Sequence, residues 1–197
     1  MTPMGNEATM PPQRQAELSY EEAVGLAMKL HREGRLEAAA KLYDALCRMA
    51  PQDPNPVHFL GVLQHSRGRL HEGLALMRKS IAMDPQVPDW HSNLGNVLLE
   101  SGRVDEAAAA YEEAARLAPD RPDIQNNLGA LRPQQKRFAQ SEAAYRRAIA
   151  LDPAFVDAHT NLGNLLHATS RDEAAMVSYC EALALKPANV RARQALG

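Results

Sequence analysis

Apolar residues recur along the chain with the spacing of one face of an α-helix. Over residues 104–118 they follow i, i+3, i+4 and i+7 steps, which favours an amphipathic helix with one buried stripe. The stripe consists of Ala107, Ala110, Tyr111, Ala114, Ala115 and Leu117. Strand alternation is absent, so the pattern predicts an all-α protein.

The helical pattern returns every 34 residues. One marker of the period is a proline; the other is a large apolar residue followed by a small one. The prolines are Pro51, Pro85, Pro119, Pro153 and Pro187, and the pairs are Leu26-Ala27, Leu60-Gly61, Leu94-Gly95, Leu128-Gly129, Leu162-Gly163 and Leu196-Gly197. Glycine falls mid-unit at Gly34, Gly68 and Gly102, where positive φ can end a helix. Each period is therefore predicted to be a hairpin of two helices, separated from the next hairpin by proline.

One such hairpin cannot bury its apolar face alone, so a fixed period predicts hairpins stacked into a solenoid with a continuous core. The small residue of each pair lets helix backbones approach closely. We therefore interpret the Leu-Gly pairs as packing positions and not as a phosphate-binding loop.

Composition and charge remove several classes of function. The 197 residues carry a net charge of −2, which offers no cationic field for nucleic acid, and contain no apolar run long enough for a membrane span. The first residues lack the features of an export signal, and the two cysteines, Cys47 and Cys180, show no metal-binding or redox spacing. His71-Glu72 begins a zinc-protease motif that lacks its second histidine. We expect a cytoplasmic protein that is not an enzyme and has no cofactor, metal site, nucleic-acid partner or membrane partner.

These columns resemble the tetratricopeptide repeat (TPR) family, whose units have Leu-Gly, Ala, an aromatic residue and Pro at these offsets. The resemblance implies a right-handed superhelical solenoid of five repeats over residues 19–189, at 20–53, 54–87, 88–121, 122–155 and 156–189. Residues 190–197 would begin a sixth repeat or form a truncated capping helix, and residues 1–18 would be a disordered tail. The family's early tryptophan is replaced in each unit, by Ala23, Val57, His91, Gln125 and His159.

Asparagines form a second repeating column. Asn93, Asn127 and Asn161 precede the core leucines and lie off the buried stripe, on the surface that the resemblance places inside the concave groove. An asparagine amide has two donors and an acceptor oxygen, so such a column can hold the backbone of an extended peptide. The candidate peptide-binding residues are Asn93, Asn96, Asn126, Asn127, Asn161 and Asn164, with His58 and His65. Alternatively, these asparagines bond locally.

An acidic column accompanies them. Asp89, Asp123 and Asp157 would favour a basic or neutral peptide, or would simply complement the dipoles at helix N-termini.

We therefore predict a non-catalytic scaffold that binds an extended peptide or a partner protein in its groove. A similar asparagine ladder occurs in the TPR regions of O-linked N-acetylglucosamine transferases and SPINDLY-like bacterial proteins. A first alternative is thus the substrate-recognition region of a larger glycosyltransferase of that kind. A second is an adaptor that self-associates through its uncapped C-terminal end.

One unit departs from the repeat. Pro133 falls inside an expected first helix, and Lys136 stands where sister units have glycine. The helix should end near Pro133. This unit would then have either a shortened helix with a longer turn or a joint at which the array bends.

Overall fold

The structure is a computed structural model that describes residues 18–131 and 137–196. These residues form helices joined by short turns, and no strand occurs among them. The helices are α1 (Tyr20–Arg32), α2 (Leu36–Met49), α3 (Pro54–Ser66), α4 (Leu70–Met83), α5 (Pro88–Glu100), α6 (Val104–Leu117), α7 (Pro122–Leu131), α8 (Phe138–Leu151), α9 (Val156–Ala168), α10 (Asp172–Leu185) and α11 (Val190–Leu196). The predicted all-α solenoid is confirmed.

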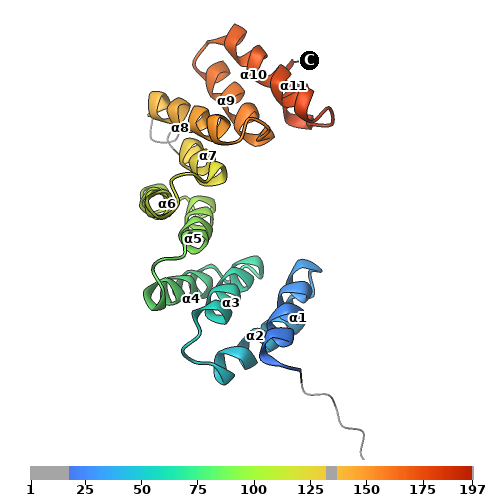
Figure 1. The fold of residues 1–197 in the computed structure, drawn as a ribbon, viewed down its shortest axis with the longest axis vertical. Coiled ribbons are helices and arrows are strands. Elements are labelled where there is room, and N and C mark those ends of the chain that lie inside the picture. Colours follow the sequence, from blue (N-terminus) through green and yellow to red (C-terminus); the bar gives the residue numbers. More distant parts are fainter. Residues whose placement is uncertain (1–17, 132–136, 197) are drawn as a thin grey trace, which may run out of the picture.

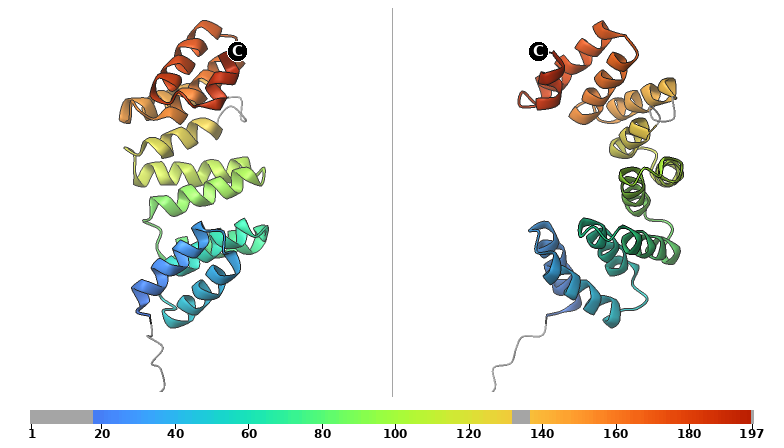
Figure 2. Two further views of the ribbon diagram at one scale, coloured as in Figure 1. Left: turned by 90° about the vertical axis from the view of Figure 1, so that its right-hand side faces the viewer. Right: turned by 180° about the vertical axis from the view of Figure 1, so that it is seen from behind.

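The helices stack into a curved array with two rows (Figure 1). The odd-numbered helices contact one another in sequence, α1 with α3 and onward to α9 with α11, and they line the inner side of the curve. The even-numbered helices form the outer row. Figure 2 shows that the array is elongated, with α1 and α11 at opposite ends.

Glycine ends the first helix of each of the first three hairpins. Gly34, Gly68 and Gly102 have φ of 73°, 77° and 74°, which explains the mid-unit glycines. In the last hairpin Ser170 takes this place with φ of 58°. The turn therefore needs the left-handed conformation but does not strictly need glycine.

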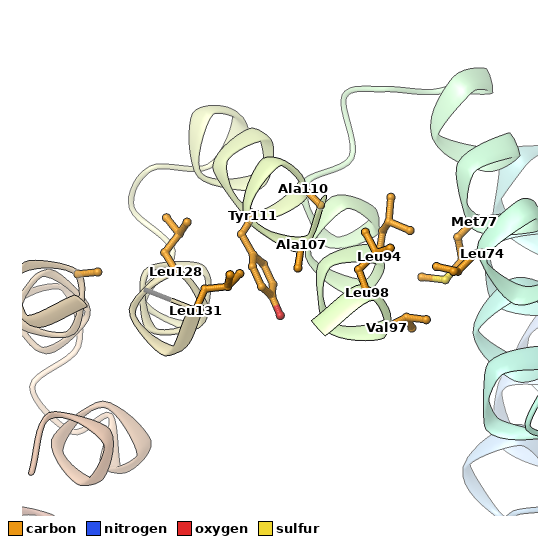
Figure 3. Close-up of a cluster of buried hydrophobic side chains, with 11 residues drawn as sticks. Leu74, Met77, Leu94, Val97, Leu98, Ala107, Ala110, Tyr111, Leu128 and Leu131 are labelled. Atoms are coloured by element: carbon orange, nitrogen blue, oxygen red, sulfur yellow. The ribbon is translucent and has the colours of Figure 1, made fainter. Parts of the chain in front are cut away.

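The Leu-Gly pairs are packing positions, as predicted. A Cβ atom added to Gly95 would lie 2.7 Å from Cε1 of Tyr111, and one added to Gly129 or Gly163 would lie 2.6 Å from the ring of Tyr145 or Tyr179. Each tyrosine comes from the second helix of the same hairpin. Figure 3 shows Tyr111 between α5 and Leu128 and Leu131 of α7, so the ring joins one repeat to the next.

The first helix of the irregular unit is described only up to Leu131. This described part of α7 has 10 residues, whereas α5 and α9 have 13. The predicted helix end near Pro133 lies outside the described residues. Residues 132–136, including Pro133 and Lys136, and the predicted tail up to residue 17 lie outside the described residues.

At the C-terminal end, α11 packs on the last hairpin. Ala192 is fully buried against a core that includes Leu162 and Tyr179. Asn189 begins the helix, because its Oδ1 accepts a hydrogen bond from the Ala192 backbone amide at 3.2 Å. Val190, in contrast, keeps 62% of its surface exposed.

Candidate functional site

The asparagine column forms hydrogen bonds between successive repeats. Each amide nitrogen reaches a side chain 35 residues earlier, on the preceding inner helix. Asn93 Nδ2 lies 3.1 Å from His58 Nε2, Asn127 Nδ2 lies 3.4 Å from Ser92 Oγ, and Asn161 Nδ2 lies 3.0 Å from Asn126 Oδ1. At the end of the array, Asn189 Nδ2 donates to Thr160 Oγ1 at 2.8 Å. Each of these asparagines is therefore hydrogen-bonded to the preceding repeat, and this bond fixes the orientation of its amide.

His58 is the most buried member of this network, with no exposed surface. Its ring stacks on Trp90, with centroids 4.9 Å apart, and its Nδ1 lies 3.1 Å from Ser80 Oγ. Because Asn93 can only donate through Nδ2, His58 Nε2 accepts and Nδ1 carries the proton. Burial lowers the pKa of His58 to about 4, so the ring is neutral at pH 7. We leave His58 out of the candidate peptide surface, because a fully buried ring offers nothing to a partner.

Asn96 and Asn164 hold the tyrosines that pack on the glycines. Tyr111 donates its hydroxyl hydrogen to Asn96 Oδ1 at 2.5 Å, and Tyr179 donates to Asn164 Oδ1 at 2.9 Å. Both asparagines remain exposed, so their amide nitrogens stay accessible.

The first hairpin lacks this pair. Met28 replaces the asparagine, and the buried Tyr43 hydroxyl has no hydrogen-bond partner among the described residues.

His65 lies near the C-terminal end of α3. Its Nε2 is 3.2 Å from Glu100 Oε2, again 35 residues along and on the next inner helix. The side chain is partly buried, so only part of it is accessible to a partner.

The predicted acidic edge is smaller than the sequence suggests. Arg121 contacts both Asp89, at 3.0 Å, and Asp123, at 2.6 Å. Its hydrogen bond to Asp123 holds the pKa of that carboxyl below its usual range. Asp157 remains exposed, close to the cations Lys186 and Arg191.

An open cavity of about 860 Å³ lies on the inner side of α7, α9 and α11. Its lining is about half polar and half apolar, and it contains three of the predicted residues, Asn126, Asn127 and Asn161. The other lining residues include Ala130, Phe155, Asp157, Lys186, Asn189 and Arg191. The inner surface of the last repeats therefore combines fixed amide groups with charges of both signs. Such a surface can bind polar or main-chain groups.

Sequence reasoning missed a second set of repeated hydrogen bonds. His91 Nε2 lies 2.9 Å from the Pro85 carbonyl oxygen, His159 Nε2 lies 3.0 Å from that of Pro153, and Gln125 Nε2 donates to that of Pro119 at 3.2 Å. These residues replace the early tryptophan of the family. The sequence did contain a signal for these hydrogen bonds. Each residue follows a repeat proline by six positions, and each side chain can donate a hydrogen bond.

Family models confirm the repeats. A tetratricopeptide repeat model matches residues 14–54 and 60–122, a TPR repeat model matches residues 132–170, and a further tetratricopeptide repeat model matches residues 156–189. The first of these alone matches more than half of the chain. The chain belongs to the tetratricopeptide repeat family.

Solved structures show the same fold at low identity. PilF of Pseudomonas aeruginosa is 21% identical with a TM-score of 0.81, over 89% of this chain and 80% of that one. TTC0263, a thermophilic TPR protein of Thermus thermophilus, is 21% identical with a TM-score of 0.74, over 90% and 99%. YrrB, described as a TPR protein with an unusual peptide-binding site, is 17% identical with a TM-score of 0.71, over 90% and 92%. These structures do not support the resemblance to glycosyltransferase TPR regions.

A comparison with curated protein sequences gives no match. Within the described ranges, no helix is both long enough and apolar enough to cross a membrane.

Proposed function

We propose that this chain is a non-catalytic scaffold that binds an extended peptide, or an extended segment of a partner protein, along its inner helix row. The observation that carries the proposal is the cavity of about 860 Å³, where Asn127 and Asn161 meet Asp157, Lys186 and Arg191. Each of these two asparagines uses one donor for its bond to the preceding repeat. The acceptor oxygen and the second hydrogen of each amide remain to hold a peptide backbone.

The fixed orientation of the amides supports this function. An amide held by the preceding repeat loses little rotational freedom when a peptide binds, so less of the interaction energy is lost to ordering. The spacing of packed helices, ~8–10 Å, also matches about three residues of an extended chain at ~3.1 Å each. One amide per repeat can therefore meet every third peptide residue.

The bonds between repeats decide how the proposal is tested. Replacing Asn93, Asn127 and Asn161 with alanine removes structural hydrogen bonds as well as peptide contacts. A better variant is Ala130→Arg, which fills the cavity and leaves those bonds intact. Sister repeats carry Met28, Val62 and Asn164 at this position, so the helix accepts a larger side chain there.

The matched control is Ala143→Arg, on the exposed outer side of α8 in the same hairpin. Peptides are selected from a random library on the full chain, and their affinities are measured by fluorescence polarisation. Ala130→Arg should weaken binding at least about tenfold, which corresponds to ~1.4 kcal/mol, and Ala143→Arg should leave it unchanged. Equal effects of the two variants, or no selectable peptide, would refute groove binding.

Self-association through the C-terminal end is a second proposal. It rests on Val190 and Leu185 in the last two helices, which leave 62% and 42% of their surfaces exposed, and Val190 also lines the cavity. Light scattering on wild type and on Leu185→Glu tests self-association without changing the cavity, and the variant should lower the mass of any wild-type assembly. A mass of one chain at all concentrations for wild type would exclude it.

A further inference from the structure

The inner surface changes character between the two ends of the array. Two columns that hold asparagine in later repeats hold three apolar residues in the first two hairpins. Phe59 stands in the column of Asn93, Asn127 and Asn161, and Met28 and Val62 stand in the column of Asn96 and Asn164. The polar column therefore begins only at α5.

Two adjoining cavities lie over these apolar residues, between α1 and α3. Their volumes are about 350 and 340 Å³, and Met28 and Phe59 border both. Val24 belongs to the first cavity, and Val62 and Tyr43 belong to the second. Met28 keeps 38% of its surface exposed, so apolar surface remains open to a ligand. α1 lies on the inner side at one end of the array, so a peptide in the groove can reach it (Figure 1).

A buried polar group points to the same place. The side chain of Tyr43 is 99% buried, and its hydroxyl lacks a partner among the described residues. In later hairpins the equivalent hydroxyls of Tyr111 and Tyr179 bond asparagines that face the inner surface. Tyr43 and Met28 border the same cavity, and the Tyr43 hydroxyl there is a buried donor without a partner among the described residues.

The two cavities differ in the charge of the residues at their borders. Glu21 and Asp53 lie on the border of the first cavity, at the N-terminal ends of α1 and α3. His31 and Arg32 lie on the border of the second cavity, at the C-terminal end of α1. A ligand with an apolar group over Met28 and Phe59 and a positive charge directed toward the first cavity would therefore meet the carboxylates of Glu21 and Asp53.

We propose that the surface formed by Val24, Met28, Phe59 and Val62 is an anchor subsite for one bulky apolar side chain of the bound peptide, with a basic residue next to it on the side of Glu21 and Asp53. This inference rests on the proposed function and divides the groove in two. The first two hairpins recognise an apolar side chain, and the later ones hold polar and main-chain groups.

The test follows methionine methyl groups by NMR in the full chain labelled with ¹³C at the methionine methyls. The probe is a soluble Gly/Ser peptide with one central leucine preceded by lysine. Two matched peptides replace the leucine with serine or the lysine with glutamate. Met176 is the internal control, because it is 56% exposed but lies on α10 in the outer row.

The leucine peptide should shift the Met28 methyl resonance saturably and leave that of Met176 in place. Burying one leucine side chain should make binding about tenfold to a hundredfold tighter than for the serine peptide. The glutamate peptide should bind several-fold more weakly. Equal shifts of Met28 and Met176, or equal binding of the leucine and serine peptides, would overturn the anchor subsite.

Two variants separate binding from folding. Met28→Asn places at α1 the residue that Asn96 and Asn164 provide for their tyrosines, so the chain should fold and lose at least about tenfold in affinity for the leucine peptide. Met28→Leu should retain that affinity. Unchanged binding by Met28→Asn would refute the proposal.

The methionine spectra, together with ¹H–¹⁵N spectra of the asparagine side-chain amides in a ¹⁵N-labelled sample, distinguish other occupants of the surface from failure of the groove itself. A Met28 shift that depends on protein concentration without peptide would assign the surface to a second copy and overturn the proposal. Movement of the Asn127 and Asn161 side-chain amides without Met28 would refute the anchor but retain groove binding. Movement of neither would refute both.

Discussion

At the scale of single residues, two glycines in helices of the inner row should respond oppositely to the same substitution. A Cβ atom added to Gly25 in α1 would have no other atom within 4 Å, so Gly25→Ala should stabilise the protein by about 0.5–1 kcal/mol through helix propensity. Gly95→Ala would place a Cβ 2.7 Å from Cε1 of Tyr111. That ring is 1% exposed and bonded to Asn96, so it cannot move aside freely.

Gly95→Ala should therefore destabilise by about 1–3 kcal/mol, the usual range for overpacking. Urea unfolding followed by circular dichroism gives both free energies. Changes of the same sign for the two variants would contradict the packing account of the Leu-Gly pairs.

His58 makes stability depend on pH. Its pKa is lowered from 6.5 to about 4 by burial, so between these values the unfolded chain binds more protons than the folded one. The free energy of unfolding should then fall as pH falls through this window, by up to about 3 kcal/mol. The stabilisation is fully present above pH 6.5.

His58→Asn isolates this contribution, because Asn126 holds the same position two repeats later and accepts from Asn161. The variant keeps an acceptor for Asn93 but cannot titrate. Its unfolding free energy, measured at pH 7 and at about pH 4.5, should change less than that of wild type. An equal change in both proteins would exclude His58 as the source.

At the scale of helices, the sequence predicts a structural feature correctly where that feature depends on a single repeated residue type. The 34-residue period predicts the hairpins, and the glycines of the first three units predict their turns. Such features depend on a residue's own size or φ, which its type reveals directly.

The hydrogen bonds of the asparagines between repeats could not be predicted from a single residue column. Each amide bonds the residue 35 positions earlier, and those partners are His58, Ser92 and Asn126. They share an acceptor atom but differ in size and in residue type, so they form no visible column. The direction of an amide therefore follows from helix packing and not from the asparagine pattern itself.

The same limit explains the buried histidine. His58 sits one residue before the asparagine column, at a position that is also buried in the next three inner helices, and Trp90 of the next repeat stacks on its ring. Trp90 lies one residue away from the family's tryptophan position. Its contact with the previous hairpin depends on how two repeats are placed in space.

At the scale of the whole molecule, the shape of the array depends on how firmly each hairpin holds the next. Repeat arrays are stabilised by contacts between neighbours, so one weak contact allows the two parts to move. Pro133 falls inside the expected first helix of the unit that joins the first three hairpins to the last, and a proline in a helix interior weakens the helix. The cavity proposed for peptide binding begins on α7, so bending at this unit would change its width.

We predict that hydrogen exchange is faster across residues 130–137 than across the equivalent residues 96–103, because Pro133 removes a helical hydrogen bond and costs ~3 kcal/mol or more in a helix interior. The double variant Pro133→Leu/Lys136→Gly restores the residues found at Leu99 and Gly102. It should slow exchange across 130–137 to the level of 96–103 and narrow the distribution of dimensions in small-angle scattering. The outer-row variant Ala143→Arg serves as the control and should change neither measurement. Equal exchange of the two segments in wild type would show that the array does not bend at this unit.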